Sequence, residues 1–242
     1  MKINNRALVI FSGGQDSTTC LYWALKKFDF VTALTFSYGQ RHIIELESAA
    51  KIAALAGVNH ELLDLGEVFS GISSLTDLDE KIPEVSIQEE NDQVKENQLP
   101  TTFVPGRNIL FLSIAGSRAY TADCDNIVIG VSQEDFAGYP DCRENFIKSM
   151  EQSLSLGLDK NITVHAPLMH LSKKETVELA SQWPQCMEAL SWSTTCYNGM
   201  VPPCGRCNSC QLRARGFREA KVEDPLVKRT SRVLKEVQNA GN

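Results

Sequence analysis

The strongest constraint on the fold is a short glycine-containing loop near the start of the chain. Residues 12–17 read Ser-Gly-Gly-Gln-Asp-Ser, follow an apolar run at residues 7–11, and precede a helix-like stretch at residues 18–28. Glycine has no Cβ and readily adopts positive φ, so both glycines can let the loop close around an anion with its N–H groups pointing inward. The following helix directs free N–H groups and the positive end of its dipole at the same anion. The order strand, loop, helix therefore predicts a phosphate site where the helix begins.

The spacing within this loop excludes two common phosphate motifs. It has neither the G-x-x-x-x-G-K-[ST] of the P-loop nor the G-x-G-x-x-G of the dinucleotide fold. A Gly-Gly pair also makes ordinary tight turns, so the pair alone does not define a site. The loop instead resembles the SGGxDS loop of the PP-loop ATP pyrophosphatases, which cleave ATP between the α and β phosphates and adenylate a substrate oxygen. That resemblance implies that Asp16 holds Mg²⁺ or orients the pyrophosphate, and that ATP is bound by Phe11, Ser12, Gly13, Gly14, Gln15, Asp16, Ser17, Thr18, Thr19, Cys20 and Leu21.

Length and composition indicate one large α/β domain with a small appendage. The chain has 242 residues, of which 43% are hydrophobic and 22% charged, as in an ordinary globular protein. We expect an ATP-binding domain over residues 1–185, followed by a zinc-binding segment and a C-terminal helix over residues 186–242. No apolar run approaches the roughly 20 residues of a membrane helix, and the polar residues 1–5 do not resemble a signal peptide. We therefore expect a cytoplasmic protein.

The net charge favours small-molecule substrates over nucleic acid. A formal charge of −6 argues against a large basic surface of the kind that binds a phosphate backbone. Residues 213–235 are a local exception, because basic side chains outnumber acidic ones there. We interpret that stretch as a solvated helix face in preference to an RNA contact.

The cysteines predict a metal site. Four of the eight follow a C-x7-C-x2-C-x2-C pattern interleaved with proline and glycine, and four thiolates on tight turns are the ligands of a closed, structural Zn²⁺ site. An iron–sulfur cluster is the competing use of the same ligands. A closed site leaves no position for substrate, so we expect the metal to stabilise a segment that is too short to bury its own core. The expected ligands are Cys196, Cys204, Cys207 and Cys210, whereas Cys20, Cys124, Cys142 and Cys186 are expected to be reduced packing residues.

Hydrophobic patterning predicts a parallel sheet with helices on both sides. Strands are expected over residues 7–11, 31–36, 60–65, 126–131 and 162–165, and helices over residues 18–28, 41–56, 109–122, 146–156 and 172–182. The alternation of strand and helix indicates βαβ units and a Rossmann-like sheet, similar to that of the adenine nucleotide alpha hydrolases. Ser172 and Glu175 form an expected capping box. Residues 77–98 are rich in acidic side chains and follow no periodicity, so we expect a mobile excursion there.

Ligands of open α/β sheets bind beyond the carboxyl ends of the strands, so the loops after residues 36, 65, 131 and 165 should share a rim with the glycine-containing loop. Residues 103–108 place an aromatic ring, a guanidinium and an amide before a helix, although a Pro-Gly turn with Asn108 as N-cap explains the same pattern. Residues 132–143 mix aromatic rings and carboxylates, which can stack on a flat heterocycle and pair with its N–H edge.

Six segments, in order, carry a closer resemblance. They are FSGGQDSTTC, SYGQRH, TTFVPGRNILFL, GYPDCR, HAPLMHLSKKET, and TCYNG with CGRCNSC, and the resemblance that they carry extends from residue 7 to about residue 215. They resemble the 7-cyano-7-deazaguanine synthase (QueC) family of queuosine biosynthesis. The resemblance implies a C–N bond-forming ligase that converts 7-carboxy-7-deazaguanine and ammonia into the 7-nitrile. It implies two ATP-dependent activations, of the acid and then of the amide, each releasing AMP and pyrophosphate.

The same resemblance suggests roles for individual residues. Asp16, Lys173 and Arg107 are the expected catalytic group, the two cations neutralising charge on the departing pyrophosphate. Lys173 is also consistent with an exposed residue in a first helical turn. The substrate contacts are expected from Phe103, Arg107, Asn108, Tyr139 and Asp141, with Phe103 or Tyr139 stacking and Asp141 pairing with the guanine-like edge. The expected ligands are ATP with Mg²⁺, and Zn²⁺; the expected assembly is a homodimer. His42, His60, His165 and His170 are not spaced as a metal set and are expected to be structural.

Three other functions are compatible with parts of the pattern. A tRNA-modifying adenylase of the same superfamily would need a basic surface, and sulfur insertion would need a reactive thiol such as Cys124 or Cys142. An amidotransferase of the NAD synthetase type often carries a glutaminase domain, for which this chain has no room. A non-catalytic nucleotide sensor would use the zinc region to bind a protein.

Overall fold

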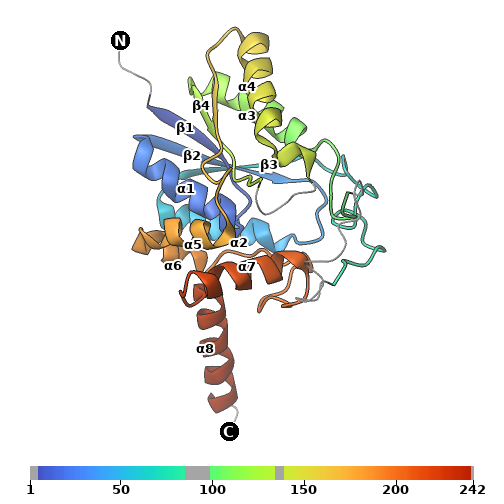
Figure 1. The fold of residues 1–242 in the computed structure, drawn as a ribbon, viewed down its shortest axis with the longest axis vertical. Helices are drawn as coiled ribbons and strands as arrows, with labels where there is room; N and C mark the ends of the chain where they lie inside the picture. Colours follow the sequence, from blue (N-terminus) through green and yellow to red (C-terminus); the bar gives the residue numbers. More distant parts are fainter. Residues whose placement is uncertain (1–4, 85–98, 134–138, 241–242) are drawn as a thin grey trace.

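A five-stranded parallel sheet forms the centre of the described chain. The computed structural model describes residues 5–84, 99–133 and 139–240. The strand order is β3-β2-β1-β4-β5, and every pairing is parallel, as predicted (Figure 1). The chain winds outward from β1 in both directions, so the sheet reverses between β1 and β4. The strands are β1 (Arg6–Ile10), β2 (Phe30–Ser37), β3 (Asn59–Asp64), β4 (Asn126–Val128) and β5 (Thr163–His165).

Helices connect and cover the strands. Glycine ends α2, because Gly57 takes the left-handed conformation at its C-terminus, and the predicted capping box of Ser172 and Glu175 begins α5. The helices are α1 (Gln15–Lys27), α2 (Ile44–Ala56), α3 (Arg107–Thr121), α4 (Glu144–Leu158), α5 (Lys173–Ser181), α6 (Pro184–Leu190), α7 (Asn208–Glu219) and α8 (Pro225–Ala240), with a short 3₁₀ turn η2 (Pro140–Cys142).

Alternate side chains of β1 enter two separate cores. Leu8 and Ile10 pack in the core beneath α3 and α4, whereas Ala7 and Val9 pack in the core with α1, α2, α5 and α6. A strand buried on both faces is expected to be apolar throughout, and the last four residues of β1 are all buried. The two helix layers flank the sheet in Figure 1.

Several boundaries differ from the predicted ones. The helix predicted from residue 18 begins at Gln15, inside the predicted loop, and the strand predicted over 126–131 ends at Val128. The helix predicted over 109–122 begins two residues earlier, at Arg107 of α3. The helix predicted over 146–156 also begins two residues earlier, at Glu144 of α4. Most of the acidic stretch 77–98 and part of the loop 132–143 lie outside the described residues, so the expected excursion is not described beyond Glu84.

The C-terminal segment packs against the sheet domain. Cys186, Leu190 and Phe217 share the core formed by α1 and β1. Arg213 of α7 is almost fully buried and holds Asp224 through two hydrogen bonds of 2.7 and 2.8 Å. The predicted boundary at residue 185 therefore falls between packed helices, and the division into two domains stays a prediction.

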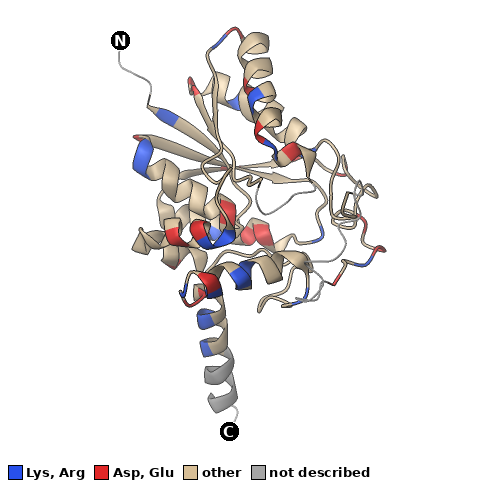
Figure 2. Ribbon diagram, viewed as in Figure 1, with Lys and Arg blue, Asp and Glu red and all other residues tan. Residues whose placement is uncertain are grey.

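The last helix extends away from the rest of the molecule (Figure 1). Leu226 anchors its first turn, and Arg229 lies 4.1 Å above the ring of Trp192. Lys and Arg residues occur along the described part of this helix, where Figure 2 shows them in blue. The basic stretch predicted as a solvated face lies on α7 and α8, and the prediction is wrong for Arg213, which is buried against Asp224. Among the described residues, we find no helix with the length and apolar character that crossing a bilayer requires.

Candidate active site

The glycine loop, residues 12–17, connects β1 to α1 and is held by its own hydroxyl groups. The Ser17 hydroxyl accepts from Ser12 N–H and donates to the Gly14 carbonyl, while Ser12 Oγ accepts from Gly14 N–H. The two hydroxyl oxygens lie 3.1 Å apart. These contacts fix the turn before any ligand binds.

Only one of the two loop glycines uses its conformational freedom. Gly13 has φ +83°, whereas Gly14 has an extended backbone at φ −78° and acts as the N-cap of α1. Gly14 therefore does not adopt the positive φ that glycine permits. A Cβ on Gly13 would lie 2.6 Å from Ala49 N and 2.7 Å from the Glu45 carbonyl oxygen. The absence of a side chain lets the loop pack directly against the start of α2.

Gly130, after β4, allows a second close backbone contact with the loop. A Cβ there would lie 3.1 Å from Ser17 N. The start of α1 therefore passes between the ends of β1 and β4, at the point where the sheet reverses. Free N–H groups at a helix start in this position are a site for a phosphate.

Asp16 and Lys173 form an ion pair at this position. Lys173 Nζ lies 2.6 Å from Asp16 Oδ2, and the Lys173 side chain is only 7% exposed. The other carboxylate oxygen, Oδ1, is buried and has no hydrogen-bond partner among the described residues. Lys173 is thus not the exposed residue that a first helical turn permits. The pair leaves one oxygen able to accept a further contact.

A cavity of about 240 Å³ opens beside the glycine loop. Its walls come from the loop, the end of β2, the start of α3, the end of β4, and the C-terminal segment. Leu75, in the long segment after β3, also lines the cavity. Of the residues predicted to contact ATP or substrate, those that line it are Phe11, Ser12, Gly14, Gln15, Asp16, Ser17, Arg107, Asn108, Tyr139 and Lys173.

The remaining predicted ATP contacts lie elsewhere. Gly13 does not line the cavity, and Thr18, Thr19, Cys20 and Leu21 are fully buried in α1. Their part in ATP binding stays a prediction. Thr195, Tyr197 and Leu212 of the C-terminal segment also line the cavity and were not predicted, because nothing in the local sequence places that segment against the loop.

The start of α3 is built around Asp141. Gly106 caps α3 with φ +78°, so Asn108 lies in the first turn and is not the N-cap that the Pro-Gly interpretation required. The Asp141 carboxylate accepts from the Asn108 N–H at 3.4 Å, and the Asn108 amide donates to the Asp141 carbonyl at 3.1 Å. Asp141 thus stabilises the helix that carries Arg107 and does not itself line the described cavity.

Aromatic rings contribute to the wall opposite the loop. Tyr139 lines the cavity, and its hydroxyl lies 2.5 Å from Thr102 Oγ1. Phe103 lies behind it, with the two ring centroids 5.6 Å apart. Arg107 Nη1 donates to the Tyr38 hydroxyl at 3.5 Å. Of the two rings predicted to stack on substrate, Tyr139 lines the cavity and Phe103 does not, and the stacking itself stays a prediction.

The two thiols considered for sulfur transfer, Cys142 and Cys124, both have raised pKa values. Burial, and then the neighbouring Asp141 carboxylate, raise the pKa of Cys142 to about 12. Burial also raises the pKa of Cys124, which lies at the other end of the sheet, where its sulfur is 3.2 Å from the Arg6 carbonyl. Because the thiolate is the reactive form, neither residue is suited to sulfur transfer.

The four histidines occupy unrelated places, and three of them make structural contacts. His60 pairs with Thr35, His165 with Asn126, and His170 with Glu144. His42 differs, because it lines the cavity together with Glu45. Sequence reasoning missed this residue, since only the spacing of histidines as metal ligands was considered.

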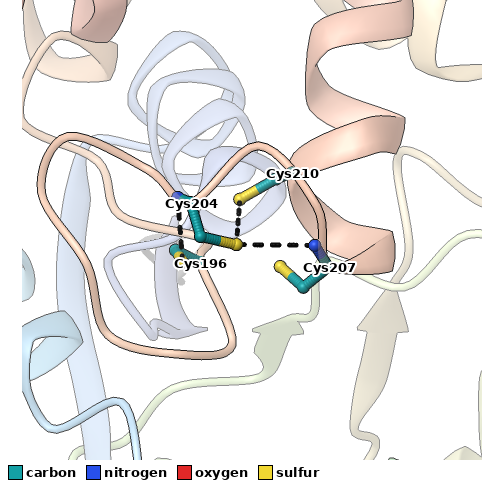
Figure 3. A group of neighbouring side chains, drawn as sticks. All are labelled: Cys196, Cys204, Cys207 and Cys210. Carbon is teal, nitrogen blue, oxygen red and sulfur yellow. Dashed lines mark hydrogen bonds between the residues drawn. The ribbon is translucent and has the colours of Figure 1, made fainter. Parts of the chain in front are cut away.

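The four predicted metal ligands form one cluster. The sulfurs of Cys196, Cys204, Cys207 and Cys210 all lie within 4.8 Å of one another (Figure 3). The Cys204 and Cys210 sulfurs are 3.8 Å apart, which is the edge of a tetrahedron with arms of about 2.3 Å, the usual zinc–sulfur bond length. Backbone N–H groups of Arg206 and Cys207 point at the Cys204 sulfur at 3.4 Å. The donor set fits a single tetrahedral metal ion.

The sheet order and the loop at its reversal point define an α/β protein with a PP-loop-type fold. A family model described as "Queuosine biosynthesis protein QueC" matches residues 6–221. The chain belongs to this QueC family.

Two similar curated proteins have the same name. The chain is 54% identical over 230 residues to "7-cyano-7-deazaguanine synthase" of Chromobacterium violaceum, covering 93% of this chain and 94% of that protein. It is 49% identical over 217 residues to the protein of the same name from Staphylococcus saprophyticus, covering 88% and 92%.

Solved structures with a similar fold are more distant. One is a U34-tRNA thiolase from Methanococcus maripaludis with its [4Fe-4S] cluster, at 15% identity and a TM-score of 0.48, covering 97% of this chain and 74% of that one. Another is a 4-thiouridine synthetase in complex with RNA and bound ATP, at 15% identity and a TM-score of 0.48, covering 90% and 50%.

Proposed function

We propose that this protein converts 7-carboxy-7-deazaguanine and ammonia into 7-cyano-7-deazaguanine with two molecules of ATP, and that it is a ligase of queuosine biosynthesis. The observation that carries the proposal is the shared cavity, which brings the glycine loop, the Asp16–Lys173 pair and Tyr139 to one place. Membership of the QueC family and relatives named 7-cyano-7-deazaguanine synthase support the choice of substrate.

The chemistry requires activation because a carboxylate resists attack. Its negative charge disfavours a nucleophile, and oxide is a poor leaving group. Transfer of AMP from ATP to the carboxylate oxygen releases pyrophosphate and supplies a better leaving group. Ammonia then displaces AMP and gives the amide. A second AMP transfer to the amide oxygen releases pyrophosphate. Loss of AMP and of both protons from nitrogen then leaves the carbon–nitrogen triple bond.

The glycine loop and the start of α1 would hold the pyrophosphate part of ATP through backbone N–H groups. Lys173, kept near the loop by Asp16, would neutralise charge on pyrophosphate as it leaves, with Arg107 acting from the facing wall. Tyr139 would stack on the flat deazaguanine. The orphaned Asp16 oxygen fits a contact to Mg²⁺, which when bound would neutralise phosphate charge.

The cysteine cluster would hold Zn²⁺ in a closed, structural site. Four thiolates fill a tetrahedral shell, so no position is left for substrate. The sulfurs lie too close together for four irons to fit between them, which favours a single ion over an iron–sulfur cluster. The metal would connect the loop at residues 196–207 to the start of α7.

The test is a reaction with the purified protein, ATP, Mg²⁺, ammonium and 7-carboxy-7-deazaguanine, followed by mass spectrometry. The proposal expects the amide and then the nitrile, with AMP and pyrophosphate as the nucleotide products. Formation of ADP and phosphate, or turnover that requires tRNA, would contradict it. Omitting ammonium should stop the reaction before the amide.

A further inference from the structure

The cavity contains an acidic residue that the proposed function does not use. Glu45 lies in the first turn of α2, and its carboxylate oxygen Oε2 is 3.2 Å from His42 Nε2. Both residues line the cavity, with side chains only 13% and 6% exposed. The pair is therefore part of the cavity wall and not of the outer surface.

The pair lies directly beside the glycine loop. The Glu45 carbonyl and Ala49 N occupy the space that a side chain on Gly13 would need. The start of α2 and the loop are thus in backbone contact, which places Glu45 next to the expected phosphate site. The reacting carboxyl carbon must come close to the α phosphate, so it must come close to this wall.

Charge makes Glu45 unusual in this cavity. The other acidic wall residue, Asp16, is paired with Lys173, and the wall residue Arg213 is paired with Asp224. Among the described residues, the ion-pair partner that we find for Glu45 is the His42 imidazole. A carboxylate whose ion-pair partner is an imidazole, and not a lysine or arginine, repels both ATP and an anionic substrate unless a cation lies between them. Glu45 is suited to hold a small cation.

His42 fixes the orientation of that carboxylate. Its Nε2 lies 3.2 Å from Glu45 Oε2, while its Nδ1 is buried without a hydrogen-bond partner among the described residues. The imidazole is enclosed by the protein and does not reach the open part of the cavity through Nδ1. We therefore assign His42 a positioning role and Glu45 the contact with the ligand.

We propose that Glu45, positioned by His42, binds the ammonium ion and takes one of its protons. This inference rests on the proposed function. The nitrogen lone pair freed in this way forms the C–N bond at the adenylated carboxyl carbon, and the C–O bond to AMP breaks with its electron pair on AMP. A second nitrogen proton passes to water, which leaves the neutral amide. A charge-assisted contact of this kind accounts for selection of ammonium within an anion-binding cavity.

The test compares ammonium with hydroxylamine, which is largely uncharged at neutral pH and gives a hydroxamate. In Glu45→Gln, the KM for ammonium should rise about 10- to 100-fold, the loss expected for one charge-assisted hydrogen bond. The ratio of hydroxamate to amide should rise by a similar factor. His42→Gln should change both quantities in the same direction and by less. Glu47→Gln, an exposed acidic residue in the same helical turn, is the matched control and should leave both unchanged.

Three outcomes would overturn the inference. Equal losses with both nucleophiles would mean that Glu45 acts in folding or adenylation. A higher Mg²⁺ requirement with an unchanged ammonium KM would mean that it binds the metal ion. Unchanged kinetics in Glu45→Gln would mean that it binds neither. Failure of the proposed function is recognised separately, because the unmodified protein would then show no exchange of labelled pyrophosphate into ATP that depends on 7-carboxy-7-deazaguanine.

Discussion

Lys173 Nζ lies 2.6 Å from Asp16 Oδ2, although the two residues are 157 positions apart in the chain. The contact joins the start of α5 to the start of α1. A cation is unfavourable at a helix N-terminus unless an anion lies beside it. Asp16 supplies that anion, and a pyrophosphate bound at the glycine loop would supply another.

Asp16→Asn should slow turnover without unfolding the protein. Asparagine keeps the shape of the side chain but loses the charge that positions Lys173, so we expect kcat/KM to fall about 100-fold, as when one electrostatic contact to a transition state is removed. The free energy of unfolding should fall by about 2 kcal/mol, less than for a fully buried pair, because Asp16 is partly exposed. Steady-state kinetics and urea unfolding measure the two effects. Lys174→Met, at an exposed neighbour of Lys173, should change neither, and a fully active Asp16→Asn protein would refute the assigned role.

Gly13→Ala should destabilise the protein more than the same change at Gly57. Both glycines have positive φ, which costs alanine about 1 kcal/mol. At Gly13 the new methyl group would also meet the backbone of α2, whereas at Gly57 nothing lies within 4 Å. We expect a loss of about 3 kcal/mol at Gly13 and about 1 kcal/mol at Gly57. Urea unfolding compares the two variants, and equal losses would show that the loop is not pressed against α2.

Cys207→Ser should lose the bound metal and much of the stability. Metal analysis of the unmodified protein should give about one zinc per chain, as for a closed tetrahedral site. The variant should contain far less and unfold at a lower temperature, since binding of a structural metal contributes to folding. Cys124→Ser, outside the cluster, should keep the metal. A Cys207→Ser protein that is free of zinc and as stable as the original would contradict the structural role.

Cys142→Ser should retain activity, because the buried thiol is not a nucleophile. With a pKa of about 12 in the folded state, Cys142 should resist alkylation by iodoacetamide at pH 8. Because its pKa is raised in the folded state, this thiol contributes stability at neutral pH. That contribution decreases as the pH rises from about 9, where the thiol ionises in the unfolded protein, to about 12, where it ionises in the folded protein. Mass spectrometry after alkylation and assays of the variant measure these expectations. Complete loss of activity in Cys142→Ser would revive the sulfur-transfer interpretation.

The sequence predicted the sheet well because its two central strands, β1 and β2, are largely apolar runs that alternate with clear helix signals. The boundary of α1 was misplaced, since Gln15, Asp16 and Ser17 look like loop residues locally but are helical once Gly14 caps them. Thr195 and Tyr197 could not be predicted as cavity residues, because their segment is held by a residue far away in the chain, the Gly13 carbonyl, which accepts from Thr194 N–H at 3.1 Å. The C-terminal segment also packs through α7 against α5. That packing requires Gly216, where a Cβ would lie 2.9 Å from Lys173 Cβ. The expected homodimer stays a prediction.

The most direct test of the account is a crystal structure with bound ATP and Mg²⁺. We expect the β and γ phosphates to accept hydrogen bonds from backbone N–H groups of residues 12–17, with Lys173 beside them and the adenosine near the end of β2. A triphosphate bound away from that loop, with the loop unoccupied, would contradict the account.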